Sequence, residues 1–122
     1  MPNLNIFDFS ELNKQRCLRW HPEGLESWSL SDWAVALAGE AGEVCDAVKK
    51  LNRVRDGLVG NREGVTEETL REAIGKELAD TVIYADLLAT RLGFDLGWLI
   101  QQKFNEVSER TGMPERISVP TH

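Results

Sequence analysis

Two short acidic motifs hold the residues whose types and spacing best fit chemistry. Glu40 and Glu43 are three positions apart, and so are Glu77 and Asp80. Residues three apart lie on one side of an α-helix, so each pair converges if both stretches are helical. Like charges held close repel one another, and a bound cation offsets that repulsion. Because oxygen ligands suit hard ions, the four carboxylates predict a site for Mg²⁺, with Mn²⁺ as a substitute.

The two histidines argue against the other common helical metal site. Di-iron bundles combine single glutamates with Glu-x-x-His motifs on facing helices. His21 lies in a predicted loop and His122 at the terminus, so neither completes such a motif. An all-oxygen Mg²⁺ site most often serves a phosphate substrate, which makes phosphoryl chemistry the predicted reaction class. The cations that can meet an anionic group are Lys50, two turns beyond the first acidic pair, and Lys103 and Arg110.

Helical periodicity surrounds both motifs and predicts an all-α fold, an antiparallel bundle of about four helices. The predicted helices run from Asp8, with Glu11 as its capping partner, to about Trp20; from a cap at Ser29 or Ser31; from a cap at Thr66 to Gly93; and from Asp95 to about Arg110. The glycine-rich stretch Arg55–Val65 is predicted to link the second and third helices. We expect an extended tail after Met113.

Apolar residues at spacings of three and four predict the inward side of each later helix. The predicted stripes are Trp33, Leu37, Ala41, Val44, Val48 and Leu51; Ile74, Leu78, Val82, Ala85, Ala89 and Leu92; and Leu96, Leu99, Ile100, Phe104 and Val107. Both acidic pairs flank a stripe, so antiparallel neighbours would bring all four carboxylates together. Gly39 and Gly42 each cost about 1 kcal/mol relative to alanine inside a helix, which predicts a packing or ligand reason for them.

Length and composition limit the fold and the partners. With 122 residues and 42% hydrophobic content, residues 1–122 are predicted to form one domain with a single core. The net charge of -6 argues against a nucleic-acid polymer as a partner. Cys17 and Cys45 form no Cys-x-x-Cys motif, which fits a reducing compartment. No stretch resembles a signal peptide or a membrane span, so we expect a cytoplasmic protein with no membrane partner.

The residues around both acidic pairs resemble a known family. LAGEAGEV (Leu37–Val44) and KELADTVIY (Lys76–Tyr84) are similar to the metal-binding signature of the MazG-like nucleoside triphosphate pyrophosphohydrolases. That all-α superfamily also holds the dCTP pyrophosphatases and the dimeric dUTPases. The stretch KFNEVSER (Lys103–Arg110), with the glycine and proline that follow it, also resembles members of the family, so the similarity covers residues 8 to 116.

The resemblance implies a Mg²⁺-dependent enzyme for cleaning the nucleotide pool. It would hydrolyse a nucleoside triphosphate, in particular a dNTP, between the α- and β-phosphates and release a monophosphate and pyrophosphate. The metal ligands and catalytic residues would be Glu40, Glu43, Glu77 and Asp80. One of these carboxylates would take the proton from the attacking water, with a preference for Glu43.

The resemblance also implies where the rest of the substrate binds. Lys50, Lys103 and Arg110 are the candidates for the phosphate tail, and Asn105 would hydrogen-bond sugar or phosphate. The lysine-to-asparagine spacing in the last helix is closer than in the dCTP pyrophosphatases. Lys103 and Asn105 therefore depart from the pattern of that family. The resemblance would place Trp28 and Tyr84 at the base site, and Trp20, which flanks the same first loop as Trp28, is a further aromatic candidate for it from its position. Trp33 and Trp98 are predicted to be packing residues.

A single short copy of the domain must complete its bundle elsewhere, whereas some MazG proteins carry two copies in tandem. Apolar stripes on more than one face predict a homodimer or a dimer of dimers, in which the neighbouring chain closes the pocket. Other classes stay open at this point. The chain could be a dUTPase-like hydrolase of the same superfamily, a non-catalytic helical dimer whose acidic pairs solvate an interface, or a sensor that binds a nucleotide without cutting it.

Overall fold

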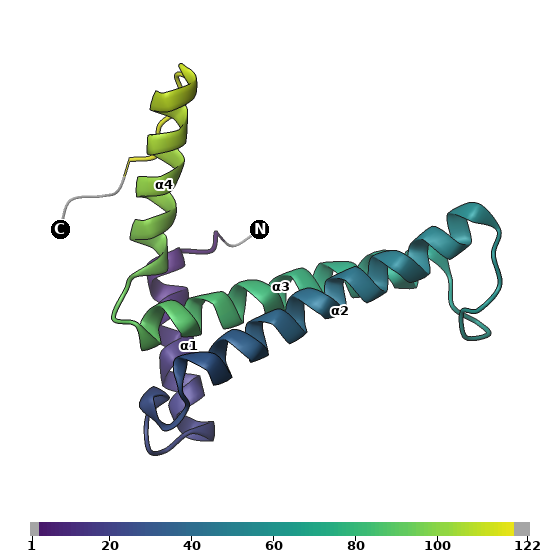
Figure 1. Ribbon diagram of the computed structural model, residues 1–122, viewed down its shortest axis with the longest axis horizontal. Coiled ribbons are helices and arrows are strands. Elements are labelled where there is room, and N and C mark those ends of the chain that lie inside the picture. The colour runs from purple at the N-terminus through teal and green to yellow at the C-terminus, as the bar shows by residue number, and fades with distance from the viewer. Residues whose placement is uncertain (1–2, 119–122) are drawn as a thin grey trace. The chain divides into compact units, whose positions relative to one another are not determined.

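The structure is a computed structural model that describes residues 3–118, and within them the chain is all-helical, with no strand. The α-helices are α1 (Ile6–Trp20), α2 (Leu30–Asp56), α3 (Glu67–Arg91) and α4 (Leu96–Thr111), and a short 3₁₀ turn, η1, covers Leu25–Ser27 (Figure 1). The predicted all-α class and the helix number are confirmed. None of the helices in this described part is long and apolar enough to cross a membrane.

The chain divides into two compact units. The hairpin unit is Trp28–Leu88, which contains α2 and nearly all of α3. The terminal unit consists of the described parts of Met1–Ser27 and Ala89–His122, and so contains α1 and α4. Each unit is described by itself below.

Side-chain caps explain where the first two α-helices begin. The Asn5 Oδ1 atom accepts hydrogen bonds from the backbone N–H groups of Phe7 at 2.9 Å and Asp8 at 3.2 Å. The helix therefore begins before the predicted start at Asp8, because Asn5 meets the N–H groups that would otherwise stay unpaired. Of the two predicted caps for α2, Ser29 is the observed one. Its Oγ accepts from the Asp32 N–H at 3.1 Å, and its own N–H donates to Asp32 Oδ2 at 2.9 Å.

The predicted caps of the later helices are present. The Thr69 N–H donates to Thr66 Oγ1 at 3.1 Å, and the Trp98 N–H donates to Asp95 Oδ1 at 3.2 Å. At the other end of α2, Gly57 takes a left-handed conformation with a φ of 67°. Glycine adopts that conformation without a Cβ clash, and it ends the helix so that the linker to α3 can begin.

In the hairpin unit, α2 and α3 lie side by side and run antiparallel (Figure 1). The most buried apolar residues on them are Trp33 and Ala47 from α2, and Leu70 and Leu87 from α3. Trp33 is only 1% exposed, as expected for a packing residue. Half-buried Leu37, Val44 and Leu51 continue the same side of α2 at spacings of three and four. We call this packed side of the two helices the seam.

Part of each predicted inward stripe lies on the surface instead. Leu78 is 51% exposed, Val82 49% and Val48 38%, and Ala41 is exposed as well. In the terminal unit the same holds for Leu92, Ile100 and Phe104, and for Trp98, which is 47% exposed rather than packed. An amphipathic stripe is wider than the contact with one neighbouring helix. A helix in a two-helix hairpin therefore buries one edge of its stripe and leaves the other edge exposed.

The two glycines of α2, Gly39 and Gly42, have no packing partner within the described chain. A Cβ atom built at Gly39 or at Gly42 would meet nothing within 4 Å. Both residues are exposed. The expected packing reason for these glycines is therefore wrong inside this chain, which leaves a ligand or a second copy as the reason to test.

In the terminal unit, α1 contacts α4, and the tail is tied to α4 by side-chain amides. A Cβ atom at Gly97 would lie 2.8 Å from Ile6 Cγ2, so a larger residue there would force the side chains of α1 to shift. The Ile117 N–H donates to Asn105 Oδ1 at 2.8 Å, and the Ile117 carbonyl accepts from Asn105 Nδ2 at 2.9 Å and from Gln101 Nε2 at 3.0 Å. As predicted, the tail after Met113 has no regular secondary structure up to residue 118.

Candidate metal centre

Three of the four predicted carboxylates meet in the hairpin unit. Glu40 comes from α2, and Glu77 and Asp80 come from α3. Each offers one carboxylate oxygen, and these oxygens all lie within 4.8 Å of one another. All three residues are half-buried. We call these residues the acidic trio.

The trio occupies positions on the packed side of the helices. Glu40 follows Leu37 by three residues and precedes Val44 by four, which is the spacing of the seam. Glu77 stands in the same relation to half-buried Ile74 and Thr81 on α3. These positions would normally carry apolar side chains, and a carboxylate there loses hydration. Retaining charge at such a place is costly unless a cation compensates.

No basic side chain provides that compensation. Within residues 3–118, neither lysine nor arginine forms an ion pair with any member of the trio. Burial, followed by the negative charges of Asp80, Glu77 and Glu43, raises the pKa of Glu40 above the ordinary value of 4.5. The site therefore favours a proton or a cation.

Glu43 lies outside the trio. It is exposed, and its carboxylate is not among the oxygens that gather within 4.8 Å. A separation of three residues turns Glu43 about 60° around the helix from Glu40, toward the flank of the seam. Its charge still contributes to the raised pKa of Glu40. The predicted cluster of four is thus a trio with a fourth carboxylate beside it.

The donor set determines which ions fit. No histidine or cysteine joins the trio, and it is the one such group of potential ligands found in the described part of the chain. Carboxylate oxygens alone suit Mg²⁺ and Mn²⁺, whereas Zn²⁺ and di-iron sites usually add nitrogen or sulfur ligands. The residues present therefore fit the hard divalent ion that the sequence predicted.

Two of the predicted phosphate-binding cations are already paired with acids. Lys50 lies in the hairpin unit, where its Nζ is 2.9 Å from Asp46 Oδ2. Lys103 Nζ is 3.6 Å from Glu106 Oε1 on α4. Arg110 is exposed on α4, and the side-chain amide of Asn105 is occupied by Ile117. These α4 residues belong to the terminal unit, whereas the acidic trio belongs to the hairpin unit.

The predicted base-binding aromatics have three different surroundings. The ring of Trp28 packs against Trp33, with centroids 4.6 Å apart and an interplanar angle of 50°. Tyr84 is half-buried on α3, one turn beyond Asp80. Trp20 ends α1 and is 67% exposed. The guanidinium carbon of Arg16 lies 5.3 Å from the Trp20 ring centroid. The i, i+4 spacing of Arg16 and Trp20 was the signal for this contact, which sequence reasoning missed.

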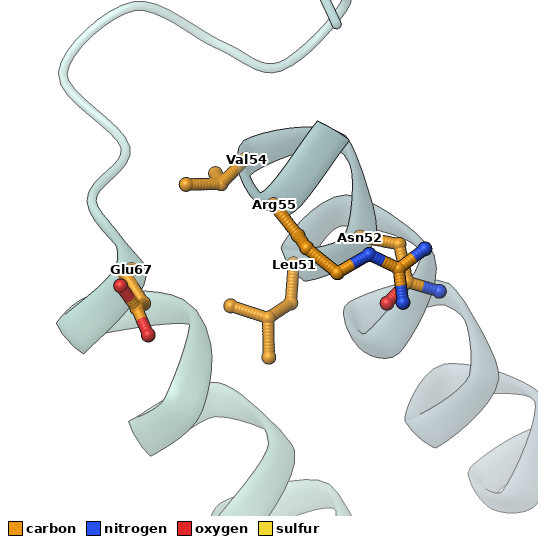
Figure 2. A pocket seen from close by; sticks show the side chains of 5 residues that line it. All are labelled: Leu51, Asn52, Val54, Arg55 and Glu67. Atoms are coloured by element: carbon orange, nitrogen blue, oxygen red, sulfur yellow. The ribbon is translucent and has the colours of Figure 1, made fainter. Parts of the chain in front are cut away.

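A pocket in the hairpin unit lies between the end of α2 and the start of α3. It has a volume of about 360 Å³ and is lined by Leu51, Asn52, Val54, Arg55 and Glu67 (Figure 2). Figure 2 shows Leu51 and Glu67 facing each other between the end of α2 and the start of α3. Arg55 pairs with Asp56, its Nε lying 2.8 Å from Oδ1. None of the predicted site residues lines this pocket.

Comparison with known proteins shows a similarity to a phage protein. No protein-family model and no solved structure matches the chain. The Gene 37 protein of Mycobacterium phage L5 is 35% identical to it over 81 residues. That match covers 66% of this chain and 65% of the phage protein, so the chain spans just under two thirds of its relative. The relative's name states no activity, and any functional assignment rests on the residues themselves.

Proposed function

We propose that this chain is a Mg²⁺-dependent nucleoside triphosphate pyrophosphohydrolase of the MazG-like type. It would cleave a (d)NTP between the α- and β-phosphates and release a (d)NMP and pyrophosphate. The observation that carries the proposal is the convergence of Glu40, Glu77 and Asp80 on the packed side of two helices, with no basic partner among residues 3–118. The resemblance of the two surrounding motifs to the family's signature supports the same reaction.

The acidic trio would hold the ion. Its oxygen-only donor set and the raised pKa of Glu40 support a divalent cation there, with Mn²⁺ able to replace Mg²⁺. When bound, such an ion neutralises charge on the phosphates and lowers the pKa of a coordinated water. The three carboxylates themselves would fix the ion at the seam and, through it, orient the triphosphate.

Glu43 is our candidate for the general base. Its carboxylate is exposed and lies outside the trio, so it can accept a proton without giving up a metal ligand. The attacking water would transfer one proton to Glu43 as its oxygen bonds to the α-phosphorus. The bond between that phosphorus and the bridging oxygen then breaks, and the pyrophosphate leaves with the electron pair.

We also propose that the protein acts as a homodimer or a dimer of dimers. Exposed small and apolar residues follow one side of α2 at spacings of four and three: Ala34, Ala38, Ala41, Cys45 and Val48. On α3, exposed Leu78 and Val82 have the same spacing. Helical geometry places both rows on one side of an antiparallel hairpin. Bulky side chains of one copy can pack over small residues of another, as in four-helix bundles.

The test of the activity is product identity. Each dNTP and NTP is incubated with purified protein and Mg²⁺, and pyrophosphate and orthophosphate are measured separately. We expect pyrophosphate and a monophosphate, and we expect neither from the Glu77→Gln variant once circular dichroism has shown that it is folded. Orthophosphate as the product contradicts the proposal. Binding without turnover indicates a sensor, and strict use of deoxyuridine nucleotides indicates a dUTPase-like enzyme.

A further inference from the structure

The two flanks of the seam in the hairpin unit differ in their chemistry. Each residue turns a helix by about 100°, and α2 and α3 are antiparallel, so residues displaced in the same rotational sense lie on one face of the hairpin. In one sense from Glu40 and Glu77 come exposed Ala41 and Leu78, which belong to the rows proposed for association. We call the opposite side the Glu43 face. Its residues beside the acidic trio are Gly39, Glu43, Lys76 and Asp80.

Lys76 brings an exposed ammonium group to the Glu43 face. Within residues 3–118 this group forms no ion pair, whereas Lys50, farther along the same face, is paired with Asp46. Arg71 is also exposed and without an ion pair in that part of the chain. It lies about 120° from Glu77 in the other sense, on the side of the association rows. An unpaired cation therefore lies beside the trio only on the Glu43 face of α3.

Lys76 and Glu43 lie at the same level on opposite helices. Glu40 on α2 meets Glu77 and Asp80 on α3, and each step forward along α2 is one step back along α3. Three steps from Glu40 bring Glu43 level with the stretch 74–77 of α3, which contains Lys76. In the described part of the chain no ion pair joins these two side chains, so each is free to contact a ligand between them.

The Glu43 face is also the open side of the trio. A Cβ atom built at Gly39 would meet nothing within 4 Å, so the backbone of α2 is uncovered beside Glu43. On the other flank, half-buried Leu37 and Ile74 lie about 60° around their helices from the carboxylates. Apolar side chains therefore border the trio on that flank. A polar ligand of the trio finds room and a cation on the Glu43 face.

We propose that Lys76 binds the β- and γ-phosphates of the nucleoside triphosphate on the Glu43 face. That the ligand is a nucleotide rests on the proposed function. In-line displacement puts the attacking water and the leaving group on opposite sides of the α-phosphorus. Glu43, the proposed base, flanks one side from α2, and Lys76 flanks the other side from α3. When the bond from phosphorus to the bridging oxygen breaks, the electron pair stays on that oxygen. The ammonium group of Lys76 stabilises the added negative charge without transferring a proton.

The test separates the β- and γ-phosphates from the rest of the substrate. The full chain is assayed in Mg²⁺ with the dNTP that releases most pyrophosphate, and inorganic pyrophosphate and the matching dNMP are titrated by calorimetry. Lys76→Gln should raise KM and weaken pyrophosphate binding about tenfold or more, the effect of losing a hydrogen bond to a charged group. The affinity for dNMP should stay at the wild-type value, because dNMP has neither of these phosphates. Lys76→Arg keeps the charge and should retain most of the pyrophosphate affinity.

Arg71→Gln is the matched control. It removes an exposed cation without an ion pair from the other side of the same helix. Because this cation does not reach the Glu43 face, the variant should keep the wild-type KM and the wild-type affinity for pyrophosphate. Circular dichroism of Lys76→Gln and Arg71→Gln should match the wild type, since both residues are exposed.

Several outcomes overturn the inference. Unchanged pyrophosphate affinity in Lys76→Gln does so, and so does an equal loss in Arg71→Gln, which would indicate only a general charge effect. An equal loss of dNMP affinity would assign Lys76 to the α-phosphate instead. The proposed function is judged separately. Pyrophosphate release with a wild-type KM in Lys76→Gln sinks the inference alone, whereas pyrophosphate binding that depends on Lys76, without turnover of any nucleotide, sinks the proposed function alone.

Discussion

At the scale of single residues, the acidic trio and Glu43 have separable roles. Glu77→Gln removes a carboxylate from the trio, so Mn²⁺ affinity measured by calorimetry should fall at least about tenfold, because loss of a group that only orients a ligand already costs about that much. Glu43→Gln should keep most of that affinity and lower kcat about 10²- to 10⁴-fold, the usual contribution of a general base. Glu72→Gln, on the exposed side of α3, is the control for both. Equal metal affinity in Glu77→Gln and Glu72→Gln would contradict the assignment.

The raised pKa of Glu40 predicts an unusual dependence of stability on pH. Below the ordinary value of 4.5 the carboxyl group is protonated in both the folded and the unfolded protein, and its repulsion is absent. As the pH rises through the raised pKa, the folded protein must ionise this group beside Asp80, Glu77 and Glu43, so this contribution to the free energy of unfolding is lost.

Urea unfolding in EDTA across this pH range measures that contribution. The wild type should lose stability relative to Glu40→Gln as the pH rises above 4.5, because the glutamine does not titrate. Saturating Mg²⁺ should remove the difference at neutral pH by compensating the charge. A wild-type curve parallel to that of Glu40→Gln in EDTA would show that the trio does not repel.

At the scale of elements, the helices were predictable because the hydrogen bonds that cap their ends join residues close in sequence. Ser29, Thr66 and Asp95 each accept a hydrogen bond from the N–H group three residues ahead, and sequence spacing reveals such caps directly. The missed start of α1 has the same cause, since Asn5 is as good a cap as Asp8 and lies further upstream. The buried edge of each stripe depends on which neighbour packs against the helix, and spacing within one helix does not encode that choice.

The helical glycine Gly39 gives a prediction at this scale. A methyl group there would meet nothing within 4 Å. Gly39→Ala should therefore raise the free energy of unfolding by up to about 1 kcal/mol in urea, because alanine loses less backbone entropy on folding. Gly57→Ala is the matched control. It also has open space, but its φ is 67°, so it should destabilise by about 1 kcal/mol.

The opposite result for Gly39 would be informative. A loss of stability in Gly39→Ala would mean that something outside the described chain packs where the methyl group would lie, which is one of the two reasons predicted from the sequence. Unchanged stability with a higher KM would instead point to a ligand that approaches the backbone of α2 beside Glu40.

At the scale of the whole molecule, the candidate site was predictable only where one hairpin contains it. The spacing of Glu40, Glu77 and Asp80 and the antiparallel return of the chain were sufficient to bring the trio together. Asn105 shows why the remainder was not. Its amide forms two hydrogen bonds with Ile117, which lies 12 residues away. No local sequence pattern predicts such a contact. An asparagine can bind a phosphate group or hydrogen-bond to another part of the chain. Only the tertiary contact of Asn105 shows that it does the second.

The exposed apolar side of the hairpin predicts that copies of this chain associate with one another. Leu78 is 51% exposed and Val82 49% exposed, side by side on α3. If a second copy covers them, Leu78→Glu buries an unpaired charge in the contact, and light scattering should show a smaller assembly than the wild type. Val59→Glu adds the same charge to the linker at a residue that is 95% exposed and should leave the mass unchanged.

Pyrophosphate release by the same variants tests this association in a second way. If the neighbouring chain closes the pocket, Leu78→Glu should lose pyrophosphate release together with mass, and raising the protein concentration should restore both by mass action. Val59→Glu should keep both. A wild type that is monomeric and fully active at micromolar concentration would contradict the association. It would also leave the small and apolar row on α2 as an ordinary solvent-exposed surface.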